Sequence, residues 1–191
     1  MLKERIINFL KENIEVNNAV ISLLSGSIEE ASALVTSTLK SGKTIFIAGN
    51  GGSATMATHI SGEFLGRFKK ERKALPSVSL AADTAALTAI ANDYGYAYVF
   101  SRQLEGLAKQ GDLLITLTTS GNSENLIKAI GAAKKLSVKT VSLSGKDGGR
   151  MNGMADLEII IPSSNTPRIQ ELHLLILHII CELVDESLLG N

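Results

Sequence analysis

The sequence of this 191-residue chain predicts an α/β fold, in which a doubly wound, five-stranded parallel sheet is covered by helices on both faces. Three observations lead to this prediction. Short runs rich in Ile, Val and Leu recur along the chain, segments with helical spacing separate them, and turns rich in small residues follow two of the runs. Strands buried on both faces have this near-continuous apolar pattern, and helical crossovers make neighbouring strands parallel. The length suits one α/β core, so we expect a single domain spanning residues 1–191.

The elements can be placed in chain order. Residues 1–41 carry apolar side chains at helical spacing, and we expect them to form two helices used in oligomer packing. The expected strands cover residues 44–49, 77–82, 113–118, 140–145 and 157–162. We expect the flavodoxin-like strand order 2-1-3-4-5.

The last segment begins "NTPRIQELHLLILHIICELVDESLL" and predicts a long helix. Thr166 can cap its N-terminus, and Pro167 suits the first helical position. The helix is apolar around most of its circumference, which favours packing against a partner subunit, although deep burial within one chain would also explain it.

The composition narrows the possible partners. The chain has 19 acidic and 19 basic residues, and this balance disfavours nucleic acid or a membrane surface as a partner, so a small molecule is expected. Cys181 is the only cysteine, which we interpret as a buried filler in a reducing compartment. The first residues are charged throughout, unlike a secretory signal, and no uninterrupted run of ~18 uncharged apolar residues follows. We therefore expect a cytoplasmic protein.

The first turn, Gly49-Asn50-Gly51-Gly52-Ser53-Ala54, lies between a strand and a helix and is typical of a phosphate-binding loop. It matches the dinucleotide fingerprint G-x-G-x-x-A, but the candidate ribose ligand Asp83 lies about ten residues beyond the usual ~20-residue spacing. A triphosphate loop ending in Gly42-Lys43-Thr44 would have Ser37 in place of its first glycine and would precede a strand. We expect no nucleotide cofactor.

The second turn, "TTSGNSEN" at 118–125, also follows a strand and leads into a helix. Its four hydroxyl side chains surround backbone N–H groups at a helix N-terminus, where an anion is favoured; they are Thr118, Thr119, Ser120 and Ser123. In the expected strand order both turns flank one crevice, so Ser53 and Ser120 would face a single phosphate monoester. Ordinary helix capping is the alternative for Ser123.

Titratable side chains are predicted beside this phosphate. His59 and Glu63 are four residues apart and share one helix face, although a common surface pair would have the same spacing. On the last helix, Gln170, Glu171 and His178 lie within an arc of roughly 100°. A core histidine with a hydrogen-bond partner is likewise the alternative for His178. A carboxylate and an imidazole beside a sugar phosphate supply the base and the acid that aldose–ketose interconversion requires.

Two further features receive no catalytic role. His173 falls on another face of the last helix, and we assign it no function. The basic run "RFKKERK" at 67–73 is interpreted mainly as a solvated loop, with capture of an anionic substrate as the less favoured reading.

Five segments together resemble the sugar-isomerase (SIS) domain family, and especially its branch that isomerises heptose phosphates. They are "IAGNGGSATMATHISGEFLGRF", "AIANDYGYAYVFSRQ", "TTSGNSENLIKAI", "LSGKDGG" and "RIQELHLLILHIICELVDE". The resemblance implies an SIS fold and conversion of sedoheptulose 7-phosphate to D-glycero-D-manno-heptose 7-phosphate, for the heptose of bacterial lipopolysaccharide. It also implies a homotetramer with active sites between subunits.

The resemblance also implies roles for individual residues. Glu63 would be the general base and His178 its acid/base partner, through an enediol-type intermediate. Zinc would be bound by His59, Glu63, Gln170 and His178. Substrate would be bound by Asn50, Gly51, Gly52, Ser53, Glu63, Asn92, Asp93, Thr118, Thr119, Ser120, Ser123 and Gln170.

Two non-enzymatic readings are alternatives. One is a regulator resembling the initiator-associating protein that binds the replication initiator DnaA, whose group lacks the carboxylate and imidazole at the positions of Glu63 and His178. The other is a sugar-phosphate-sensing domain, which would need the phosphate loops but neither titratable group. The presence of both groups in this chain favours the enzyme.

Overall fold

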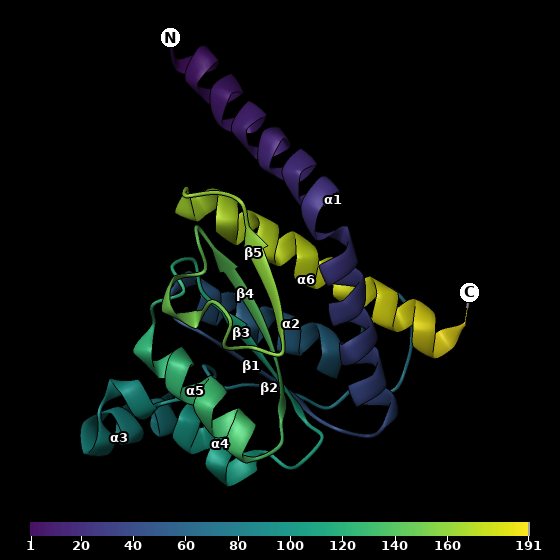
Figure 1. Cartoon of the computed structure of the whole chain (residues 1–191). Helices are drawn as coiled ribbons and strands as arrows, with labels where there is room; N and C mark the ends of the chain where they lie inside the picture. Colours follow the sequence, from purple (N-terminus) through teal and green to yellow (C-terminus); the bar gives the residue numbers. More distant parts are fainter. Residues whose placement is uncertain (191) are drawn as a thin grey trace.

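Figure 1 shows the computed structural model of the chain, in which residues 1–190 are described. The helices are α1 (Leu2–Lys40), α2 (Gly52–Leu65), α3 (Thr84–Tyr94), α4 (Ser101–Leu107), α5 (Glu124–Lys135) and α6 (Thr166–Leu189), with short 3₁₀ turns at Tyr96–Tyr98 and Gly149–Met151. The strands are β1 (Ile45–Gly49), β2 (Ser77–Ser79), β3 (Leu113–Leu117), β4 (Lys139–Gly145) and β5 (Leu157–Ile161). All pairings are parallel and the order is β2-β1-β3-β4-β5, which confirms the predicted doubly wound sheet.

The sheet separates two hydrophobic cores. Ile45 and Ile47 of β1 point into the core formed with α1, α2 and α6, whereas Phe46 and Ala48 point into the core formed with α4 and α5. This alternation follows from the period of two in a strand. Every residue of β1 and β3 is buried because helices cover both faces, which explains the near-continuous apolar runs in the sequence.

The N-terminal region differs from the prediction of two helices, since α1 is one continuous helix. The run Ser25-Gly26-Ser27 lies inside this continuous helix. Gly26 costs about 1 kcal/mol in a helix interior but does not stop it. The Ser25 hydroxyl, which could have competed with the helical backbone, donates to the carbonyl of Ile21 one turn earlier.

The two halves of α1 have different surroundings. The C-terminal half packs on α6 and β5, with Ala31 and Val35 fully buried. The N-terminal half extends beyond the rest of the molecule, and Figure 1 shows it as the purple end. Its exposed apolar residues are Leu2, Ile6, Ile7, Phe9, Leu10 and Ile14. An 18-residue window of α1 is apolar enough by composition to cross a membrane, but the C-terminal half of α1 belongs to the hydrophobic core.

Asn165 occupies the N-cap position of α6 without a side-chain capping hydrogen bond, and Thr166 is the first helical residue, so the predicted start was one residue late. Most of its circumference is buried within the chain, which fits the alternative of deep burial. Leu175, Ile179 and Leu183 nevertheless form an exposed stripe at a spacing of four. This stripe lines a groove with residues of α1 and leaves an apolar strip of the helix exposed.

Candidate active site

The turn after β1 is built around small residues. Gly51 has a φ of +55°, and a Cβ at Gly49 would lie 2.7 Å from the Cβ of Ser53. The chain therefore passes from β1 directly into α2, and the first turn of α2 contains no acidic side chain. An anion is favoured at such a helix N-terminus, because the backbone N–H groups and the helix dipole both point toward it.

The turn after β3 is braced by a second glycine-rich loop. Gly121 packs so closely on the segment at Gly148 that a Cβ at Gly121 would overlap the Gly148 carbonyl. The Thr118 hydroxyl accepts hydrogen bonds from the backbone N–H groups of Ser120 and Gly121, at 3.4 and 3.2 Å. This hydroxyl holds the turn in shape and keeps its own proton free to donate.

Ser123 occupies the N-cap position of α5, but its side chain makes no capping hydrogen bond. Ordinary capping was the alternative explanation for this serine, and the structure does not bear it out. The half-buried hydroxyl remains available beside the N-terminus of α5. Its role in phosphate binding stays a prediction.

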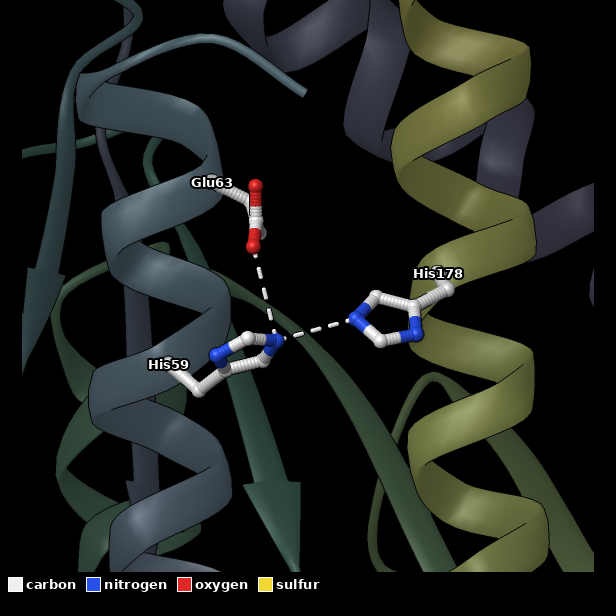
Figure 2. Close-up of side chains that lie close together, drawn as sticks. All are labelled: His59, Glu63 and His178. Atoms are coloured by element: carbon white, nitrogen blue, oxygen red, sulfur yellow. Dashed lines mark hydrogen bonds and ion pairs between the residues drawn. The ribbon is translucent and has the colours of Figure 1, made fainter. Parts of the chain in front are cut away.

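Figure 2 shows three titratable side chains converging from two helices. His59 and Glu63 extend from α2 and meet His178, which extends from α6. The Nε2 atoms of the two histidines lie 3.0 Å apart, and His59 Nε2 lies 3.4 Å from Glu63 Oε1. Glu63 and His178 thus lie close together within one chain, and their catalytic roles stay a prediction.

The surroundings of His178 favour the neutral imidazole. Burial lowers the pKa of His178, the charge on His59 lowers it further, and the carboxylate of Glu63 opposes both effects. The ring of Phe68 stacks on the His178 ring at a centroid distance of 5.5 Å, which restricts its orientation. A neutral imidazole can accept a proton or bind a metal.

The cluster also fits a metal ion. The ligand atoms of His59, Glu63 and His178 all lie within 4.8 Å of one another. Two nitrogens that bind a tetrahedral zinc ion at 2.0–2.1 Å are about 3.3 Å apart, close to the separation of the two Nε2 atoms. Two imidazoles and a carboxylate are ligand types that zinc accepts. The identity of the metal stays a prediction.

The other predicted residues have different positions. Gln170 lies over Gly52 at the start of α2, with its Nε2 only 2.9 Å from where a Cβ of Gly52 would be. It therefore faces the phosphate turn, and its role as a zinc ligand stays a prediction. Asn92 and Asp93 are exposed on α3, where the amide of Asn92 donates to the carboxylate of Asp93. Glu171, which shares the helix face of His178, is bonded instead to Asn13 and Arg168.

The sequence prediction missed three residues of this region. Asn125 is buried and exchanges two hydrogen bonds with Asn50, at 2.8 and 3.0 Å, while the hydroxyl of Tyr96 donates to the Asn50 oxygen. Phe68 was hidden in the basic run. The available signals in the sequence were Asn125 in the first turn of α5 and the aromatic Phe68 among basic residues. Neither signal indicates which distant residue it contacts.

Comparison with known proteins places the chain in one family. Residues 8–145 match the SIS domain family. The chain is 51% identical over 190 residues to the phosphoheptose isomerase of Campylobacter concisus, with both chains fully covered. The phosphoheptose isomerase structure from Neisseria gonorrhoeae has a TM-score of 0.92 and 37% identity, covering 97% of this chain and 100% of that one. The structure from Francisella tularensis has a TM-score of 0.94 and 33% identity, covering 97% and 99%.

Proposed function

Since the chain belongs to the SIS domain family and to the phosphoheptose isomerases within it, we propose that it converts sedoheptulose 7-phosphate to D-glycero-D-manno-heptose 7-phosphate. The observation that carries this proposal is the meeting of Glu63 and His178 beside a helix that opens with a phosphate-binding turn. The product would supply heptose for bacterial lipopolysaccharide.

The phosphate end of the substrate would be held between the two turns. Ser53 and the hydroxyls of the second turn would donate hydrogen bonds, and the N-termini of α2 and α5 would add their dipoles. The free Ser123 hydroxyl supports this role. Asn50, held by Asn125 and Tyr96, would bind a sugar hydroxyl, together with Gly51, Gly52, Asn92, Asp93 and Gln170. Anchoring one end of the open-chain sugar leaves its reactive carbons to be placed between α2 and α6.

The chemistry is a proton transfer between two neighbouring carbons. Glu63 would remove a proton from C1 of the ketose, and the C1–H electron pair would form the enediol double bond while the C2 oxygen gains a proton. His178 would exchange protons with the substrate oxygens, and Glu63 would return its proton to C2. Each positioned acid or base contributes about 10²- to 10⁴-fold to the rate.

Zinc, as proposed, would be held by His59, Glu63 and His178, with Gln170 as a fourth ligand. Bound there, it would polarise the oxygen atoms of the substrate as a Lewis acid.

We further propose that the single domain assembles as a homotetramer in the cytoplasm. The exposed apolar residues on the N-terminal half of α1 and the stripe Leu175, Ile179 and Leu183 support this assembly, because a monomer would leave them in water. The α1 segment would then be the oligomer-packing region, and the active sites would lie between subunits.

Isotope exchange tests the function. Purified protein with Zn²⁺ is incubated with sedoheptulose 7-phosphate in deuterated water, and deuterium at the carbon next to the carbonyl is measured. We expect incorporation together with formation of the aldose. Five- and six-carbon ketose phosphates serve as controls, and we expect slower turnover with both. Absence of deuterium with every substrate would exclude isomerase activity. The chain would then be a regulator resembling the DnaA-binding protein or a sugar-phosphate sensor.

A further inference from the structure

Most of the basic run after α2 is exposed, as expected of a solvated loop, but Arg72 of this run forms a buried ion pair with α6. Arg72 Nε donates to Asp185 Oδ1 of α6 at 2.6 Å, and both side chains are only 3% exposed. Removing two charges from water is costly, and an apolar pair of similar volume is often equally stable or more so. Stability alone is therefore a weak explanation for this pair.

Arg72 also binds the C-terminal end of α2. Its Nη2 donates to the carbonyl of Glu63 at 2.8 Å, and its Nη1 donates to the carbonyl of Phe64 at 2.9 Å and to that of Gly66 at 3.3 Å. The last four carbonyls of a helix lack intrahelical partners, and a cation there is favoured by the helix dipole. One guanidinium group thus holds the turn of α2 that carries Glu63.

Asp185 connects the same guanidinium to the helix that carries His178. The two residues are seven positions apart on α6, which places them on one helix face to within about 20°. Phe68, four residues before Arg72, stacks on the ring of His178. The segment from Phe68 to Arg72 therefore contacts both reactive helices at their facing sides.

We propose that Arg72 and Asp185 are positioning residues, which fix the spacing between α2 and α6 and with it the approach of Glu63 to His178. The inference rests on the proposed function, because it assigns the spacing to catalysis. A planar guanidinium fixes the direction of several hydrogen bonds at once, whereas an apolar contact is not directional. A displacement of about 1 Å between reacting groups can lower a rate by roughly 100-fold.

The test separates positioning from stability. The double variant Arg72→Met/Asp185→Leu replaces the ion pair with apolar side chains, a change that often costs little stability. The carbonyls of Glu63, Phe64 and Gly66 lose their donor, so we expect the variant to fold with a lower melting temperature. We expect kcat to fall by about 10- to 100-fold, because the helices are no longer held in register. KM should change by less than about threefold, since the phosphate turns lie at the other end of α2.

A matched control exists on the same two elements. Lys69 and Glu182 form an exposed ion pair between the basic run and α6, with side chains 60% and 43% exposed. Lys69→Gln/Glu182→Gln should change kcat by less than about twofold, because exposed pairs contribute little. An equal loss of kcat in this control and in the double variant would contradict the proposal.

Zn²⁺ affinity, measured by competition with a chromogenic chelator, provides a readout that does not depend on turnover. We expect about tenfold weaker Zn²⁺ binding in the double variant, because supporting contacts outside a metal's ligand shell have effects of this size. If the original protein shows no isotope exchange, the proposed function is wrong, and the spacing is still tested by this affinity. A folded double variant with unchanged kcat and unchanged Zn²⁺ affinity would overturn the positioning role. Should the double variant not fold, Asp185→Asn is measured by the same criteria, with the same expected losses and the same overturning result.

Discussion

Two faces of α6 each carry a histidine. The surroundings of His173 give it a structural role, whereas those of His178 make it a candidate for catalysis. His173 is fully buried against β4, where its Nε2 lies 3.0 Å from the carbonyl oxygen of Ser144. A carbonyl can only accept, so Nε2 carries the proton and donates it. His178, about 140° around the helix, faces His59 and Glu63.

The comparison shows that the bonds already made by a polar group decide what it can do. The N–H of His173 donates to the backbone of β4, which fixes the ring. Burial lowers the pKa of His173 to about 4, so the ring stays neutral at pH 7. His178 meets two titratable groups instead of a backbone carbonyl. A buried histidine with a backbone partner is structural, whereas one that converges with other titratable groups is a candidate for chemistry.

The largest expected effect is on the reactive face. His178→Gln and Glu63→Gln should each lower kcat by about 10²- to 10⁴-fold, because each removes a positioned acid or base. The melting temperature should change little, since neither side chain is in the core. Steady-state kinetics and thermal unfolding measure both quantities, and binding of the ketose phosphate should persist. Unchanged turnover in either variant would remove that residue from the mechanism.

Substitution of His173 should have the opposite effect, with a loss of stability and little change in turnover. His173→Ala should lower the free energy of unfolding by about 2–4 kcal/mol, because it leaves a cavity and removes the donor to Ser144. Turnover per folded molecule should stay within about threefold. Urea unfolding and kcat at a temperature where the variant is folded provide the measurements. A stable variant with reduced kcat would contradict the division between the two faces.

The pH dependence of stability sharpens the same comparison. The pKa of His173 is about 4 in the folded protein and lies near 6.5 when unfolded, so the unfolded chain binds the additional proton. Stability from this residue is therefore present above pH 6.5 and is lost as the pH falls toward 4, by up to about 1.4 kcal/mol per pH unit. Urea unfolding of the original protein and of His173→Gln at pH 7 and pH 5 isolates the effect. The pH-induced loss should be smaller in the variant, which cannot titrate, and equal losses would exclude His173 as its source.

Much of this arrangement could be predicted from the sequence, because it depends on local patterns. The strands of the sheet and the shared face of His59 and Glu63 follow from periodicity, which acts over a few residues. The assignment of no function to His173 followed from helical phase. The meeting of α2 with α6 came from the family resemblance, since no local rule brings residues 63 and 178 together.

The missed features depend on contacts between distant segments. Arg72 lies in a run that looks solvated, and only the position of Asp185 on α6 makes it buried. Asn125 looks like an ordinary residue in a first helical turn until Asn50 is placed against it. The prediction of two helices in residues 1–41 was wrong for a related reason, because the packing of α1 on α6 supports one continuous helix despite the local cost of Gly26.

The smallest expected effect concerns two helix N-caps, which can be compared in the same way as the two histidines. Asp83 accepts a hydrogen bond from the N–H of Ala86 at 2.9 Å and so caps α3, whereas Ser123 makes no such bond at α5. Asp83→Ala should therefore cost about 0.5–1 kcal/mol of stability and leave KM unchanged. Ser123→Ala should leave stability within about 0.5 kcal/mol and raise KM several-fold, because it removes a donor to the phosphate. Urea unfolding and KM are measured for both variants. Only Asp83→Ala should lower the free energy of unfolding, and only Ser123→Ala should raise KM. A loss of stability without a change in KM for Ser123→Ala would reassign this serine to capping and remove it from the phosphate site.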